Sequence, residues 1–194
     1  MKVLIVSDTH GQHRMLDYVL EKEQGIDLLI HCGDLEGGEH YLKAVVTCPV
    51  YMVKGNNDFF SDVPREEEFS VAGYKVFLTH GHSYFVSLDY ERIKEEGKER
   101  HADIIMFGHT HKPYLEEGEN LTLLNPGSLS YPRQEGRQSS YIIMHVEEGK
   151  KPVFEQHYIV PAEIQKKKKE IPIPEEVIVK KPRRFNALLE FFDL

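Results

Sequence analysis

Potential metal-binding side chains follow five of the short apolar runs in this 194-residue chain. Each run has the length and the aliphatic content of a buried β-strand. The seven side chains are Asp8 and His10 after residues 3–6, Asp34 after 28–31, Asn56 after 50–53, His80 after 76–78, and His109 with His111 after 104–107. Ligands in open α/β sheets bind outside the carboxyl ends of the strands. The sequence therefore predicts a two-metal site at the carboxyl edge of a sheet.

The residue types in this set indicate which ions it would hold. Taken singly, the motifs are ordinary: Asp8-Thr9-His10 could cap a helix, and Asn56-Asn57-Asp58 could be only a turn. Histidine pairs in the segments 79–82 and 108–111 are harder to ascribe to turns. Imidazole, carboxylate and amide ligands suit borderline or harder cations. We expect two divalent ions, Mn²⁺ foremost, with Fe²⁺, Zn²⁺ and Ni²⁺ as alternatives.

The alternation of strand and helix patterns predicts an α/β fold. Strands are expected at 2–7, 27–31 and 50–53, with helices near 15–20 and 37–46 between them. Residues 69–78 read as a hairpin that turns at Ala72-Gly73, and 88–100 as a helix. The remaining expected strands are 103–107, 113–116, 121–124, 141–146 and 153–159. We expect a four-layer α-β-β-α sandwich of two mixed sheets flanked by helices.

The pattern changes near residue 161, which divides the chain into a domain over 1–160 and a C-terminal tail over 161–194. A lysine run and alternating prolines predict an extended linker. A short amphipathic helix is expected at 185–192, where Phe185, Leu188, Leu189 and Phe192 share one face. That helix could dock on its own domain or on a second copy, forming a homo-oligomer; a partner protein or a membrane surface is the alternative.

Charge and cysteine usage narrow the class of partner. The formal net charge of the chain is −8. The tail carries eight Lys or Arg against six Asp or Glu and is therefore +2, which leaves residues 1–160 with −10. Nucleic acid is an unlikely general partner for so acidic a body, because affinity for it comes largely from Lys and Arg.

Two free cysteines, Cys32 and Cys48, and the lack of an apolar stretch long enough for a bilayer predict a cytoplasmic protein with no membrane span.

Five motifs in order resemble the signature of the calcineurin-like metallophosphoesterases: Asp8-x-His10, Gly33-Asp34, Gly55-Asn56-x-Asp58, His80 and Gly108-His109-x-His111. With the loop 125–128, the chain is similar to the small bacterial and archaeal single-domain phosphodiesterases of that superfamily. The resemblance implies that Asp8, His10, Asp34 and His111 surround a first ion. It implies that Asp34, Asn56, His80 and His109 hold a second ion, with Asp34 shared.

The resemblance also implies a reaction, in which a hydroxide that bridges two cations attacks a small or nucleotide-like phosphodiester in line. Many relatives have a histidine, the proton donor to the leaving group, where this chain has Asn57. His82 is the candidate replacement, against a role as a supporting or exposed histidine. Asn57 and Asp58 complete the predicted catalytic set. Asn125, Ser128 and Arg133 are candidates for substrate contact, each with a structural role as the alternative.

Two other functions compete with hydrolysis of a small diester. A subunit of the eukaryotic retromer resembles this group and serves as an interaction platform, so an inactive protein-binding scaffold is the main alternative. Asn57 in place of the acid and the predicted tail helix favour that hypothesis. A metal-dependent nuclease would use the same site, but the acidic body argues against a nucleic-acid groove.

Overall fold

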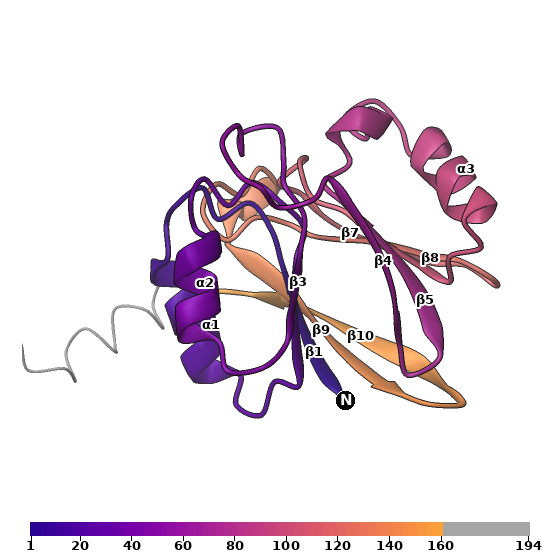
Figure 1. The fold of residues 1–194 in the computed structure, drawn as a ribbon, viewed down its shortest axis with the longest axis horizontal. Coiled ribbons are helices and arrows are strands. Elements are labelled where there is room, and N and C mark those ends of the chain that lie inside the picture. The colour runs from indigo at the N-terminus through magenta and orange to yellow at the C-terminus, as the bar shows by residue number, and fades with distance from the viewer. Residues whose placement is uncertain (161–194) are drawn as a thin grey trace, which may run out of the picture.

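The computed structural model describes residues 1–160, which form two mixed sheets with helices on their outer faces (Figure 1). The first sheet has the order β10-β9-β1-β2-β3 and the second the order β4-β5-β6-β8-β7. In the first sheet the strands are β1 (Lys2–Val6), β2 (Leu28–His31), β3 (Val50–Met52), β9 (Ser140–Glu147) and β10 (Lys150–Tyr158). In the second they are β4 (Glu66–Val71), β5 (Tyr74–Thr79), β6 (Ile104–Met106), β7 (Pro113–Glu117) and β8 (Thr122–Pro126).

Parallel pairing brings the carboxyl ends of the central strands to one edge of each sheet. In the first sheet β1 pairs in parallel with β2, and β2 with β3, whereas β9 runs antiparallel beside β1. In the second, β5, β6 and β8 are parallel neighbours, and β4 and β7 are antiparallel edge strands. The side chains that follow β1, β2 and β3 therefore lie at one edge of the first sheet. Those that follow β5 and β6 lie at one edge of the second sheet.

Alternation of side chains along the strands produces the layers. Ile5 and Ile30 face Leu78 and Met106 in a core between the two sheets. On the opposite face of the first sheet, Leu4 packs with Leu16 and Leu42 of the helices α1 (Arg14–Lys22) and α2 (Glu39–Val45). Because successive strand residues point to opposite faces, nearly continuous apolar runs are needed to fill both layers.

The outer face of the second sheet packs against the third helix, α3 (Glu91–Glu99). Phe77 of β5 and Ile105 of β6 are buried with Ile93 of α3 in a separate cluster. The layers thus run helix, sheet, sheet, helix, and the predicted fold class is confirmed (Figure 1). Among residues 1–160, no helix is long and apolar enough to cross a membrane. The predicted tail and its helix lie outside the described residues.

Element boundaries differ from the predictions by a few residues where local hydrogen bonds decide them. The hairpin turns at Ala72 and Gly73 as predicted, with φ of 47° and 88°, the left-handed pair of a type I′ turn. The predicted helix over 88–100 begins only at Glu91, whose N–H donates to the Asp89 carboxylate at 3.0 Å. Two 3-10 helices, His82–Tyr84 and Glu135–Arg137, have no periodic signal in the sequence.

Candidate metal centre

The loops that leave β1, β2 and β6 bring a first group of predicted ligands together. One ligand atom each from Asp8, His10, Asp34 and His111 lies within 4.8 Å of all the others. His111 Nε2 is 3.1 Å from Asp8 Oδ1 and 3.2 Å from His10 Nε2. His10 Nε2 is also 3.9 Å from Asp34 Oδ2. These separations place two imidazoles and two carboxylates around one point, the donor set expected of a divalent cation site.

The other three predicted ligands adjoin this group on the far side of Asp34. His80 Nε2 lies 3.4 Å from Asp34 Oδ2, and the His80 and His109 rings are 5.3 Å apart. His109 Nδ1 lies 2.9 Å from the Asn56 side-chain oxygen. The seven residues therefore form one cluster, with the Asp34 carboxylate between its two halves.

The outer nitrogens of three histidines are held by acceptors, which aims the inner nitrogens at the cluster. Nδ1 of His80 is 2.7 Å from the Cys32 carbonyl, and Nδ1 of His111 is 2.7 Å from the Tyr131 carbonyl. A carbonyl oxygen only accepts, so each Nδ1 must carry the proton. His10 Nδ1 lies 2.7 Å from the Glu36 carboxylate. Partners of this kind fix the tautomer and the ring orientation of metal-ligating histidines.

Two buried polar atoms without partners fit a cluster that holds a divalent cation. Asp8 Oδ1 and His80 Nε2 are buried and have no hydrogen-bond partner among the described residues. Buried polar atoms are almost always hydrogen-bonded, because an unsatisfied one costs about 1–3 kcal/mol. Both atoms point into the cluster, and each is an acceptor that a metal ion would satisfy.

Backbone conformation at the ligands is unusual. Five of the seven have positive φ, a region that residues other than glycine enter rarely: Asp8 (54°), His10 (46°), Asp34 (56°), His109 (68°) and His111 (57°). Each such residue costs of order 1–3 kcal/mol, and such conformations concentrate at functional sites. The conformation directs consecutive side chains of each loop toward the cluster.

Burial and neighbouring charges set the protonation states of Asp34 and His109. Burial alone would raise the pKa of Asp34, but the neighbouring His80 ring and the two hydrogen bonds from Asn57 hold the pKa of this carboxyl well below its ordinary value. Burial, together with the charge of His80, lowers the pKa of His109 to about 4. At neutral pH the carboxylate is therefore charged and His109 is neutral, the forms in which both residues bind metals.

Asn57 and Asp58 hold the loops that carry the ligands. The Asn57 backbone N–H donates to Asp34 Oδ1 at 2.9 Å, and its side-chain amide donates to Asp34 Oδ2 at 2.7 Å. The buried Asp58 carboxylate accepts from the backbone N–H groups of Leu35, Glu36 and Gly55 at 3.1, 2.5 and 2.8 Å. These contacts position the loops, and the catalytic role of Asp58 stays a prediction.

His82, the predicted general acid, lies beside the second half of the cluster. Its ring is 5.5 Å from that of His80 and 6.1 Å from that of His109. Burial and the charge of His80 lower the pKa of His82, which reduces the protonated fraction that a general acid requires. Its role as the acid stays a prediction.

Two of the three predicted substrate residues are buried and hydrogen-bonded to the loops that carry the predicted ligands. The fully buried Asn125 amide donates to the Gly108 carbonyl at 2.7 Å and accepts from the Gly127 N–H at 2.8 Å. Buried Ser128 donates to the Asp8 carbonyl at 2.9 Å and accepts from the Tyr131 N–H at 2.8 Å. The polar atoms of both side chains form hydrogen bonds that hold the ligand loops. Contact of either side chain with substrate stays a prediction.

His31, which the sequence does not mark as a ligand, supports the same loops. Its Nδ1 accepts from the Gly33 N–H at 3.2 Å, so Nε2 carries the proton and donates to Thr9 Oγ1 at 3.0 Å. Burial lowers the pKa of His31 to about 4, which keeps the ring neutral. The ring thus links the loop after β1 to the loop after β2.

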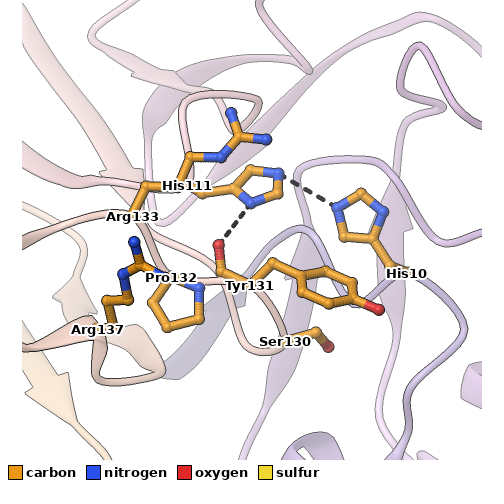
Figure 2. A pocket seen from close by; sticks show the side chains of 7 residues that line it. All are labelled: His10, His111, Ser130, Tyr131, Pro132, Arg133 and Arg137. Atoms are coloured by element: carbon orange, nitrogen blue, oxygen red, sulfur yellow. Dashed lines mark hydrogen bonds between the residues drawn. The ribbon is translucent and has the colours of Figure 1, made fainter.

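A cavity of about 720 Å³ opens beside His10 and His111 (Figure 2). Its other lining residues are Ser130, Tyr131, Pro132, Arg133 and Arg137. Of the predicted substrate residues, Arg133 alone lines it. Tyr131 and Arg137 also line it, and no motif in the sequence predicts either of them. The cavity gives a substrate access to the first half of the cluster.

Comparison with known proteins agrees with this geometry. Residues 1–149 match the model of the calcineurin-like phosphoesterase superfamily domain. The chain belongs to this superfamily. It is 34% identical over 148 residues to the probable metallophosphoesterase YsnB of Bacillus subtilis, covering 76% of this chain and 85% of that one. It is 27% identical over 145 residues to the phosphodiesterase MJ0936 of Methanocaldococcus jannaschii, covering 66% of this chain and 83% of the relative.

Among solved structures, the fold is similar to that of a Vps29 double mutant from Entamoeba histolytica, with a TM-score of 0.70. The match is 24% identical and covers 83% of this chain and 94% of Vps29. A likeness at this identity concerns the fold. The assignment to the superfamily rests on the match over residues 1–149.

Proposed function

We propose that this member of the superfamily is a cytoplasmic phosphodiesterase that hydrolyses a small or nucleotide-like phosphodiester with two divalent cations. The observation that carries the proposal is the proximity of the seven predicted ligands, in which buried Asp8 Oδ1 and His80 Nε2 lack partners among residues 1–160. We assign Asp8, His10, Asp34 and His111 to one cation, and Asp34, Asn56, His80 and His109 to the other. Mn²⁺ is the expected ion, ahead of Fe²⁺, Zn²⁺ and Ni²⁺.

A pair of divalent cations, when bound, lowers the pKa of water to produce a nucleophile and neutralises charge on the phosphoryl oxygens. The chain's own residues hold that chemistry in place. Asn57 fixes both oxygens of Asp34, and Asp58 ties the loop of Asp34 to the loop of Asn56. Arg133 offers a guanidinium to an anionic substrate in the cavity. His82 is assigned the proton transfer to the leaving group.

Metal-dependent turnover of bis-p-nitrophenyl phosphate tests the proposal. The full chain should hydrolyse this diester with Mn²⁺, and chelation should lower the rate about 10²-fold or more, because cations of this kind contribute several kcal/mol to transition-state stabilisation. Release of p-nitrophenol measures the rate. The monoester p-nitrophenyl phosphate is the matched control and should be hydrolysed more slowly. A preparation shown by metal analysis to hold two ions, yet inactive on the diester, would contradict the proposal.

A protein-binding scaffold is the alternative, and exposed aromatic side chains beside the ligand loop favour it. Phe59 is 80% exposed and Phe60 103% exposed, directly after the Asn56–Asp58 segment. Exposed apolar groups of this size often mark interaction sites. As a scaffold, the protein should capture a stable partner after metal removal and lose it on Phe59→Ser/Phe60→Ser substitution. A pull-down with metal-free wild type and variant measures this, and retention by the variant would count against the alternative.

A further inference from the structure

We propose that Arg133 and Arg137 form a subsite for a second phosphate group of the substrate. The inference rests on the proposed phosphodiesterase function and makes its substrate class more specific. It starts from the cavity of about 720 Å³, which is larger than a single phosphate requires and falls in the range of pockets for nucleotide-sized ligands. The substrate would be a phosphodiester that also carries a phosphate monoester.

Neither arginine has a carboxylate partner among the described residues 1–160. Arg100, elsewhere in the protein, pairs with Glu66, Glu68 and Glu96 at 2.8, 2.7 and 2.6 Å. Within residues 1–160, by contrast, the guanidinium of neither Arg133 nor Arg137 forms an ion pair. In a domain of formal charge −10, two cations that line one cavity without carboxylate partners form a local site for an anion.

The backbone holds both arginines at the cavity. The Arg133 N–H donates to the carbonyl of the ligand His111 at 3.0 Å, which fixes its position relative to the metal cluster. Gly136 and Arg137 both have positive φ, 76° and 46°, in the short helix Glu135–Arg137. A positive φ at arginine costs conformational free energy, and such strain is concentrated at ligand-binding positions. The turn directs Arg137 to the cavity wall.

The scissile phosphate and the arginine subsite are different places. The scissile group must lie at the cation cluster, toward which His10 and His111 direct their Nε2 atoms. In Figure 2, Arg137 and His10 lie at opposite ends of the labelled set, with His111 and Tyr131 between them. Guanidinium groups also suit phosphate in particular, because their fork of N–H donors matches the phosphate oxygens.

Two p-nitrophenyl esters of thymidine 5′-phosphate, one with and one without a 3′-phosphate, test the proposal on the Mn²⁺-loaded full chain. The leaving group is the same, so the ratio of their kcat/KM values isolates the second phosphate. We expect the 3′-phosphorylated ester to be preferred on the order of 10-fold to 100-fold, the range for charge-assisted hydrogen bonds. Arg137→Ala should bring the ratio close to one, and Arg137→Lys should give an intermediate value.

Lys43→Ala, which removes a charge from the exposed last turn of α2, is the matched control and should keep the wild-type ratio. Calorimetry gives a readout that does not need turnover: thymidine 3′,5′-bisphosphate should bind the wild type at least about 10-fold tighter than thymidine 5′-phosphate, and Arg137→Ala should remove that difference. Circular dichroism verifies that each variant is folded.

Failure of the subsite and failure of the proposed function are distinguishable. Turnover of bis-p-nitrophenyl phosphate with no preference for the 3′-phosphorylated ester, and no effect of Arg137→Ala on the ratio, would overturn the subsite and leave the phosphodiesterase intact. Absence of turnover on every diester would overturn the function, and the calorimetric comparison would still decide whether the arginines bind a second phosphate.

Discussion

The Asp34→Asn variant should hydrolyse bis-p-nitrophenyl phosphate about 10³-fold or more slowly than the wild type. This loss is larger than the roughly 10²–10³-fold that one transition-state contact typically contributes. Asp34 is the carboxylate between the two halves of the cluster, with Oδ2 3.4 Å from His80 Nε2 and 3.9 Å from His10 Nε2. Asparagine has the same shape but one acceptor oxygen and no charge. It therefore cannot serve both cations.

The same substitution should reduce the metal content. Asn57 already donates its backbone and side-chain N–H groups to the two Asp34 oxygens, so an amide at position 34 also loses one of these hydrogen bonds. We expect metal analysis by mass spectrometry to fall from two ions per chain to one or none. Glu148→Gln, an exposed carboxylate-to-amide change in the turn between β9 and β10, is the control and should leave both quantities unchanged. An Asp34→Asn protein with two bound ions and near wild-type kcat would refute the shared role.

The proximity of the seven predicted ligands could be foreseen because it depends on where the strands end. Apolar runs such as residues 3–6 and 28–31 are long enough to identify as buried strands, and parallel pairing brings their ends to one edge. The order and direction of the strands then bring the predicted ligands together, whatever the exact conformation of each loop. The hairpin at Ala72-Gly73 was predictable for a similar reason, since its two residues dictate the turn.

The surroundings of the ligands depend on contacts that the sequence does not encode locally. Asn125 and Ser128 resemble loop residues that could meet a substrate, yet both are buried because backbone groups of the ligand loops need hydrogen-bond partners. Glu36 contacts His10 across 26 positions, and Arg137 reaches the cavity through a strained turn. No motif or periodicity precedes either residue. Such pairings become visible only when loops from distant strands are placed in space.

The Gly33→Ala variant should be destabilised by roughly 3 kcal/mol and should bind metal about 10–100-fold more weakly. Gly33 has φ of +102°, where alanine is strained, and an added Cβ would lie 2.6 Å from His80 Nδ1 and 3.0 Å from the Gly55 N. The His80 ring has no room to retreat, since it is fully buried and its Nδ1 is held at 2.7 Å by the Cys32 carbonyl. Relief must come from the loops, which displaces His80 from the cluster.

Gly25→Ala separates this steric effect from backbone strain. Gly25 has φ of +71° but nothing within 4 Å of the added Cβ, so its substitution should cost only the strain of about 1 kcal/mol. Thermal unfolding of the metal-free proteins should therefore show a drop in Tm for Gly33→Ala of about 6–12 °C, against about 2–4 °C for Gly25→Ala. Titration with Mn²⁺ should weaken only in the first variant. Equal losses in the two variants would mean that the close packing of Gly33 against His80 does not hold the ligand in place.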